Sequence, residues 1–382
     1  MTVSGSGERS LGSMRYVLPP ATFALLHVLH GAVLYLTLRS GGRFSVPFMN
    51  IWKTPPLAYD WLYLFSAWDT DYYLSIARSW YPQNLSPSWA FFPLYPALIR
   101  LGSTILVVDV SVTAFAISVT ASMVSIVVFQ RVGEHYMHYR DALVATFLYF
   151  LLPPVFTFSF ALYTEPLFLV LTLAAWYLHI KSRDCKAAAI AALASLTRAY
   201  GILIILPIAV DNLRKSEFRK LRYLLIPISS LAGWLFYGFV ATGVWLAPPA
   251  AQSYWQSPNA LSLQHNLLAL LEGNLNVWSA LAPYAPIAAV GVVSLAFTLF
   301  LTSRVVRMDR SLGLYLCTSL GAIAYFAFLA ANLSLPRYLA FLFPIGLALK
   351  LKSLVPLFVA LILLWILDYF AWLAFLTTTF FH

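Results

Sequence analysis

Long apolar runs recur along this 382-residue chain, and most of them have the length that a membrane-spanning helix requires. Hydrophobic residues make up 61% of the chain and charged residues only 10%, far fewer than the charged share of about 25% in a soluble domain. Because a soluble fold cannot hide so much apolar surface, we expect an all-α polytopic membrane protein with one domain over residues 1–382. The apolar runs are 17–38, 103–130, 141–162, 164–181, 187–209, 222–246, 281–303, 313–333, 336–350 and 354–377.

The net charge of +10 does not indicate binding to nucleic acid, because the basic residues form short clusters between the apolar runs. Such clusters are typical of the cytoplasmic loops of membrane proteins. Ten simple spans with the N-terminus inside would place the basic stretch 211–221 outside, against this pattern. Arg198 and Gly201 divide the run 187–209 into halves too short to cross a core of about 30 Å. We therefore predict about nine spanning helices and one re-entrant helical hairpin over 187–209, with Arg198 near its tip.

In this topology the two longest polar intervals, 39–102 and 247–280, are extracytoplasmic loops. Apolar and aromatic residues recur at helical spacing in the first loop, which predicts an amphipathic helix lying in the membrane interface. They are Leu62, Phe65, Tyr72, Ile76 and Trp80. The first apolar run lacks a convincing cleavage site, so we expect a retained helix rather than a signal peptide.

Two carboxylates on this side are candidates for chemistry. Asp69 lies on the predicted interfacial helix, where a carboxylate facing a cavity can act as a general base, while Asp71 points to another face. Glu165 follows Thr164, a plausible N-cap, at the outer start of an apolar run. A solvated or capping role is the alternative for Asp69, and stabilisation of the helix dipole is the alternative for Glu165.

Two arginines are expected on the same side. Arg198 interrupts an apolar run, where a charge is costly unless an anion accompanies it. Glu165 or an aspartate of the first loop would serve structurally, and a lipid-linked phosphate would serve functionally, because a guanidinium matches phosphate geometry. Arg337 lies at the extracytoplasmic start of the apolar run 336–350. A set of purely structural ion pairs is the alternative interpretation.

Other patterns are less specific. The stretch Ala90–Pro96 carries two prolines among aromatic residues, which predicts a rigid non-helical segment before the second span. It can line a site or anchor the chain in the interface. His135 and His138 have no accompanying ligand pattern, so we expect no metal there, and no glycine-rich nucleotide loop is present.

Together these segments resemble the GT-C glycosyltransferases, most closely the PIG-V type, which comprises the second GPI mannosyltransferase and its prokaryotic relatives. The matching segments follow the family order over about residues 60–340. They are Trp68-Asp69 followed by Tyr72 or Tyr73 and Ile76-Ala77, then Ala90–Pro96, Tyr163–Phe168, Leu196–Arg198 with Gly201, and Pro336–Tyr338. Family members often carry an acidic residue just before the Phe-Phe-Pro stretch, and the interval Gln83–Trp89 has none. The compact chain favours a prokaryotic relative.

The resemblance implies a GT-C-like bundle that transfers a sugar, typically mannose, with inversion on the extracytoplasmic or lumenal face. The implied donor is a polyprenyl- or dolichyl-phosphate sugar, and the acceptor is a lipid-linked molecule or a glycan. The membrane would be the cell membrane in a prokaryote and the endoplasmic reticulum in a eukaryote. Neither a cofactor nor an essential metal is expected.

The resemblance also implies roles for individual residues. Asp69 takes the proton of the acceptor hydroxyl, Arg198 and Arg337 stabilise the departing phosphate, and Glu165 orients an arginine or the acceptor. The residues expected to line the sugar or lipid groove are Trp68, Asp71, Tyr72, Tyr73, Phe92, Tyr95, Tyr163 and Tyr338.

Three other functions remain open from the sequence. Broken helices with polar groups also occur in transporters and lipid flippases, although no pair of related halves is visible here. A non-catalytic subunit of a glycosylation complex would keep the fold without needing Asp69. Another GT-C activity, with a different sugar or a protein acceptor, would keep both the fold and the need for Asp69.

Overall fold

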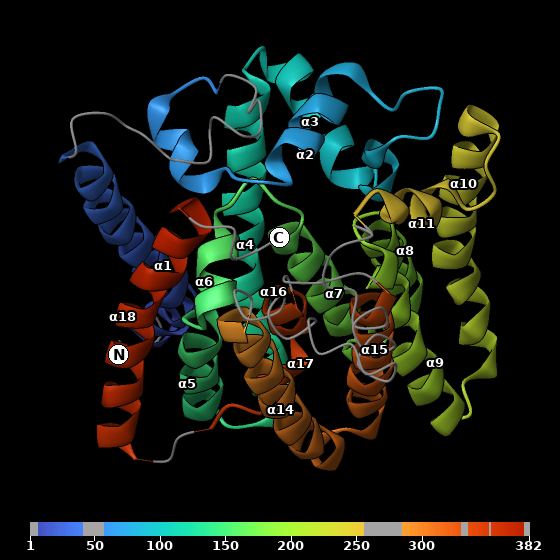
Figure 1. Ribbon diagram of the computed structural model, residues 1–382. Helices are drawn as coiled ribbons and strands as arrows, with labels where there is room; N and C mark the ends of the chain where they lie inside the picture. Colours follow the sequence, from blue (N-terminus) through green and yellow to red (C-terminus); the bar gives the residue numbers. More distant parts are fainter. Residues whose placement is uncertain (1–6, 41–56, 256–284, 330–334, 351–352, 378–382) are drawn as a thin grey trace, which may run out of the picture.

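The computed structural model describes residues 7–40, 57–255, 285–329, 335–350 and 353–377, and every regular element in these ranges is a helix (Figure 1). Four stretches of helix are long and apolar enough to cross a membrane, or five if one bent pair counts as a span. They lie in α1 (Gly7–Ser40), α4 (Val110–Tyr136), η5 with α10 (Phe218–Thr242) and α18 (Leu354–Thr377). The prediction of an all-α multi-pass membrane protein is confirmed, whereas a total of about nine spans is not reached in the described ranges.

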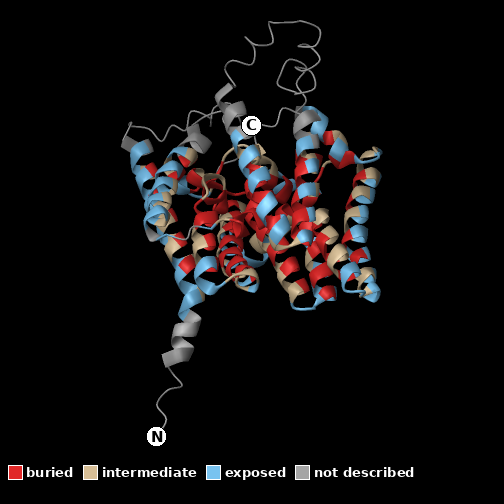
Figure 2. Cartoon of the chain, turned by 90° about the horizontal axis from the view of Figure 1, so that it is seen from below, coloured by how far each residue is buried: buried red, intermediate tan, exposed pale blue. Residues whose placement is uncertain are grey.

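The interior of the bundle is built around α7 (Glu165–Ile180), which packs against α4 and α8 (Asp184–Ser195). Buried residues occur on almost every side of α7, as expected for a helix surrounded by other helices. By contrast, α10 and α18 keep most of their apolar side chains exposed. Figure 2 shows the buried residues gathered in the interior and the exposed ones on the outer helix faces. Lipid is the solvent that suits such faces.

The predicted run 141–162 is a bent pair rather than one straight helix. α5 (Tyr139–Phe150) and α6 (Pro153–Ser159) meet at 75°. The prolines at the start of α6 explain the break, because proline lacks an N–H and disfavours a helical conformation in the residue before it. Beyond α6 the Leu162 amide donates to the Phe65 carbonyl over 2.8 Å, which joins this segment to the first loop.

The prediction of one spanning helix over 336–350 is wrong. The segment forms two short helices, α16 (Leu335–Ala340) and α17 (Pro344–Leu347), because Pro344 begins a new helix. It packs against α14 (Ala285–Met308) and α15 (Arg310–Leu329) and is almost wholly buried. Backbone that leaves the helix at membrane depth must be buried in protein, and this segment meets that condition.

The run 187–209 folds as a helical hairpin. It comprises α8, the 3₁₀ helix η4 (Ala199–Ile204) and α9 (Ile205–Arg214). His179, in the last turn of α7, contacts both ends of the hairpin: its Nδ1 lies 2.6 Å from Asp184 and its Nε2 lies 2.8 Å from Asp211. The chain therefore goes out along α8 and returns along α9. That the hairpin re-enters the membrane from one side stays a prediction.

The turn of the hairpin depends on a close backbone contact. A Cβ added to Gly201 would lie 2.1 Å from the carbonyl oxygen of Ala194, so only glycine fits here. Arg198 sits just before η4 in an extended conformation. The Leu196 carbonyl accepts a 2.9 Å hydrogen bond from the Leu94 amide, which ties the turn to the segment after the first loop.

The predicted amphipathic helix of the first loop is two helices, η2 (Asp60–Phe65) and α2 (Thr70–Ser79). The chain turns between them, and Trp68 has a left-handed φ of 51° there. Downstream, the prediction that Ala90–Pro96 is non-helical holds only for residues 91–93. Ala90 ends the 3₁₀ helix η3 (Pro87–Ala90), and Leu94–Pro96 begin a separate helix, α3 (Leu94–Leu106). Because Val107 adopts a left-handed conformation and Asp109 caps the next helix, α4 begins at Val110 rather than at 103.

The hairpin makes a prediction about membrane sidedness. Lys220, beyond α9, forms a 2.9 Å ion pair with Asp184, so the loops before α8 and after α9 lie at the same end of the molecule. In a Cys317→Ser background, native Cys185 and an engineered Ser216→Cys should react with an impermeant maleimide from the same side. Gln83→Cys, an exposed position after α2, should react from the opposite side. If positions 216 and 83 react from the same side, the segment from α8 to α9 is a simple span and not a hairpin that re-enters the membrane.

The contact at Gly201 makes a prediction about stability. Gly201→Ala should lower the melting temperature in detergent by several degrees, because the new methyl group collides with the backbone of α8. Gly233→Ala is the matched control, since nothing lies within 4 Å of its added Cβ in α10. It should leave the melting temperature unchanged or raise it, because alanine favours a helix. Equal melting temperatures for the two variants would contradict the close contact.

Candidate active site

Four charged side chains from separate segments meet at one place. They are Asp69 just before α2, Glu165 at the start of α7, Arg198 in the hairpin turn and Arg337 in α16. Arg337 Nη2 lies 3.1 Å from Asp69 Oδ2, and Arg337 Nε lies 3.0 Å from Glu165 Oε1. Arg198 Nη1 lies 2.5 Å from the same Glu165 oxygen. We call these four residues the charge network.

The network combines charge balance with burial. Two carboxylates face two guanidiniums, so the formal charge of the four groups is zero. The side chains of Glu165 and Arg337 are only 1% and 3% exposed, and either charge would be strongly destabilising there without its partner. Asp69 and Arg198 are more open, at 28% and 11% exposure. The more exposed half of the network therefore consists of one carboxylate and one guanidinium.

Two side chains at helix N-cap positions face the network instead of capping their helices. Asp69 occupies the N-cap position of α2, but its side chain makes no capping hydrogen bond. Thr164 occupies the N-cap position of α7 as predicted, but its side chain makes no capping hydrogen bond and its hydroxyl faces the network. Thr164 Oγ1 accepts from Arg198 Nη1 over 3.2 Å and lies within hydrogen-bond distance of the Tyr73 hydroxyl, at 3.1 Å. Thr164 and Tyr73 thus extend the network towards α2.

Aromatic rings cover both arginines. The Tyr338 ring centroid lies 4.8 Å from the guanidinium of Arg198 and 4.9 Å from that of Arg337, and its hydroxyl accepts from Arg337 Nη2. Tyr200 adds a second ring beside Arg198, at 5.4 Å. Phe158 and Tyr163 lie beside Arg337, both at 5.2 Å. Such cation–π contacts hold a guanidinium in place without neutralising it.

Sequence reasoning missed Thr164 as a network member, and it missed Phe158 and Tyr200 altogether. Thr164 precedes Glu165 and Tyr200 lies two residues after Arg198, so proximity in sequence to a buried charge was the available signal. Phe158 carries no comparable signal, because it is one of many aromatic residues in an apolar run.

Asp69 has the properties of a proton acceptor. Its Oδ2 atom binds Arg337, while its Oδ1 atom has no hydrogen-bond partner within the described ranges. Burial raises the pKa of Asp69 above its ordinary value, although the nearby Arg337 guanidinium lowers it. A carboxylate with one anchored and one open oxygen can accept a proton from a hydroxyl placed against the open side.

Among the predicted lining residues, Tyr73, Tyr163 and Tyr338 join the charge network. Tyr72 is half-buried and stacks on Phe91 with ring centroids 4.5 Å apart. Tyr95 is fully buried, and its hydroxyl donates to the Ala114 carbonyl in α4, which is a packing role.

The remaining predicted lining residues are Trp68, Phe92 and Asp71. Trp68 occupies the strained turn before Asp69. Phe92 is buried, with its ring centroid 6.3 Å from that of Trp234 in α10. Asp71 makes no contact with the network within the described ranges. Burial raises the pKa of its carboxyl to about 7, while Arg78 lowers it.

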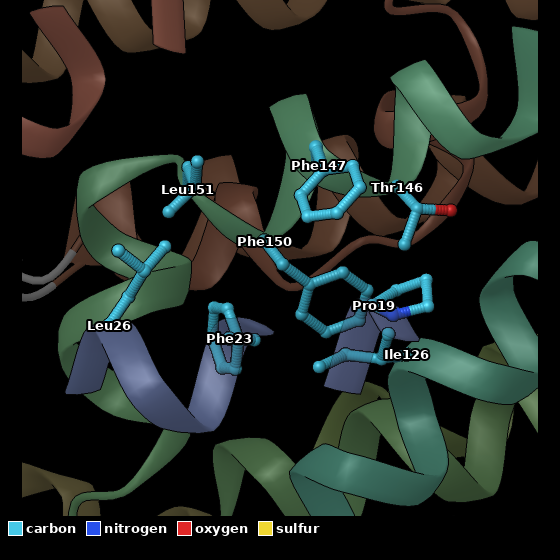
Figure 3. A pocket seen from close by; sticks show the side chains of 8 residues that line it. All are labelled: Pro19, Phe23, Leu26, Ile126, Thr146, Phe147, Phe150 and Leu151. Carbon is cyan, nitrogen blue, oxygen red and sulfur yellow. The ribbon is translucent and has the colours of Figure 1, made fainter. Parts of the chain in front are cut away.

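A pocket elsewhere in the bundle does not compete with this site. It lies between α1, α4 and α5, and its cavity of about 10 Å³ is about the size of one water molecule (Figure 3). Its lining residues are apolar except for one threonine: Pro19, Phe23, Leu26, Ile126, Thr146, Phe147, Phe150 and Leu151. No group of three or more His, Cys, Asp and Glu side chains suited to a metal ion occurs in the described part of the chain.

Comparison with known proteins identifies the family. The family model described as Mannosyltransferase (PIG-V) matches residues 56–266, which is more than half of the chain. Comparisons with curated proteins and with solved structures found no match. The matched stretch contains Asp69, Glu165 and Arg198, and the fold brings Arg337 to them from beyond it. The chain belongs to the PIG-V mannosyltransferase family.

Proposed function

We propose that this chain transfers mannose from a polyprenyl- or dolichyl-phosphate donor to a hydroxyl of a lipid-linked or glycan acceptor, with inversion, on the extracytoplasmic or lumenal face. The family supports the mannosyl transfer. The observation that carries the mechanism is the charge network: two arginines share Glu165, and Arg337 also holds one oxygen of Asp69 while the other oxygen stays open.

The proposed step is a single displacement at the anomeric carbon. The acceptor hydroxyl gives its proton to Asp69 Oδ1, while its oxygen forms a bond to that carbon. The bond between the carbon and the phosphate oxygen breaks, and the phosphate leaves with the electron pair. Attack opposite the leaving group inverts the anomeric configuration. Because negative charge grows on the phosphate, guanidinium groups placed beside it lower the barrier.

Both arginines keep donors for a phosphate while they hold Glu165. A guanidinium has five N–H donors. In the described part of the chain, the polar contacts of Arg198 run through Nη1 alone, which leaves Nε and Nη2 for an anion. The contacts of Arg337 use Nε and Nη2, which leaves Nη1. A phosphate can therefore bind without breaking the ion pairs that keep the arginines in place.

The charge distribution along α7 supports the proposed side of the membrane. Glu165 begins this helix, and His179 stands in its last turn, beside the base of the hairpin. The basic residues Lys215 and Lys220 form ion pairs at that base, so basic clusters and charge network lie at opposite ends of α7. By the positive-inside pattern, this arrangement supports a network on the outer side, in the cell membrane of a prokaryote or the endoplasmic reticulum of a eukaryote.

The first test of the mechanism is Asp69→Asn. In an in vitro assay with a panel of polyprenyl-phosphate sugars, the wild type should transfer mannose, and the variant should be slower by about 10²- to 10⁴-fold because it lacks the base. Asp60→Asn, an exposed aspartate of the same loop, is the control and should keep full activity. A folded Asp69→Asn protein with wild-type transfer would exclude Asp69 as the base.

The second test is the pH dependence of transfer. The base must be deprotonated, so kcat/KM should fall as the pH drops through the pKa of Asp69, which lies above the ordinary carboxyl value. Arg337 lowers this pKa, so Arg337→Gln should raise it further and move the acidic limb of the profile to higher pH. Arg100→Gln, which removes an exposed arginine outside the network, should leave the limb in place. If the acidic limb lies at the same pH in the wild type and in both variants, Arg337 does not lower the pKa of the base.

A further inference from the structure

The hydroxyl of Tyr163 bridges two backbone groups of the first loop, which a substrate-lining role does not explain. It accepts a hydrogen bond from the Asp69 amide over 3.1 Å and donates to the Ala67 carbonyl over 2.7 Å. The side chain is fully buried. A hydroxyl that donates on one side of a residue and accepts on the other fixes the backbone between them.

The residue between these two backbone groups is Trp68, whose φ of 51° is rare for a bulky side chain. Such a conformation is strained and persists only where surrounding contacts hold it. Within the loop, Thr70 closes the turn by donating from its amide to the Ala67 carbonyl over 3.1 Å. Tyr163 adds a bond from a distant part of the chain, and this bond acts on the amide of Asp69 itself.

The ring of Tyr163 lies beside Arg337, the ion-pair partner of Asp69. Its centroid lies 5.2 Å from the Arg337 guanidinium, which binds Asp69 Oδ2. One side chain therefore contacts the backbone of the aspartate and the charged group of the arginine. It also precedes Thr164 and Glu165, so the same stretch of backbone sets all of these contacts.

We propose that Tyr163 is a positioning residue that holds the strained turn at Trp68 and thereby directs the Asp69 carboxylate at the acceptor hydroxyl. This inference rests on the proposed function. Tyr163 acts through Asp69 and does not touch the sugar. Loss of its hydroxyl frees the turn, so the Asp69 carboxylate moves relative to Arg337 and to the acceptor.

The test is Tyr163→Phe, which keeps the ring beside Arg337 and removes only the hydroxyl. The kcat should fall by about 10- to 100-fold, since displacement of a reacting group by about 1 Å has effects of that size. The donor KM should stay within about twofold, because both arginines keep their ion pairs with Glu165. The acidic limb of the pH profile should move to higher pH, because Asp69 loses part of the effect of Arg337.

The matched control is Tyr81→Phe. Tyr81 is also buried in the outer region, and its hydroxyl donates to the Phe91 carbonyl over 2.7 Å, outside the charge network. It should keep the wild-type kcat and pH profile. Rates are expressed per donor-binding site, counted by titration with polyprenyl phosphate, so that misfolded protein does not imitate a lower kcat.

Two outcomes overturn the inference in distinguishable ways. If the wild type is active, Asp69→Asn is inactive and Tyr163→Phe behaves like Tyr81→Phe, the positioning role is excluded while the proposed function stands. If the wild type transfers no sugar from any donor of the panel, the proposed function and the role of Tyr163 fall together. A lower kcat with an unchanged donor KM and a shifted limb, in Tyr163→Phe alone, supports the inference.

Discussion

The carboxylate of Glu165 is the contact on which the centre of this structure depends. One of its oxygens lies within ion-pair distance of both Arg198 and Arg337, which come from the hairpin turn and from α16. Two guanidiniums brought together in a nearly dry interior repel each other unless an anion stands between them. A single buried charge therefore decides how three segments, distant in sequence, can pack.

The first loop is fastened to this centre by its backbone as well as by its charge. The Leu162 amide donates to Phe65 and the Leu94 amide donates to Leu196, so the chain on either side of α2 is tied to the segment before α7 and to the hairpin. Asp69 completes the charge balance through Arg337. These backbone bonds lie around the network rather than in it, and they hold the segments that carry the four charged groups.

Electrostatics made part of the site predictable from the sequence. An arginine in an apolar run requires an anion, and this requirement alone linked Arg198 to Glu165 or to an aspartate of the first loop. The sequence left open which carboxylate pairs with which arginine, because that depends on how α16 packs. A hydroxyl just before a helix commonly caps it, so the sequence predicts capping by Thr164, and only the tertiary structure turns this hydroxyl towards Arg198.

The fold was predictable in class but less so in its interruptions. Hydropathy measures how apolar a run is and not whether its helix is continuous, so the run 336–350 was expected to span although Pro344 divides it. The break at Arg198 and Gly201 was visible because a charge and a glycine marked it. The turn at Trp68 had no such mark, because the strain is held by Tyr163, which lies far along the chain.

The position of Arg337 beyond the family-matched stretch has a consequence for biogenesis. Ribosomes make Asp69, Glu165 and Arg198 before Arg337. These first three groups have a net formal charge of −1. The missing positive charge arrives only with the C-terminal part of the chain. A nascent polypeptide halted before α16 thus holds an uncompensated carboxylate near its centre, and the last helices to be inserted complete the neutral interior.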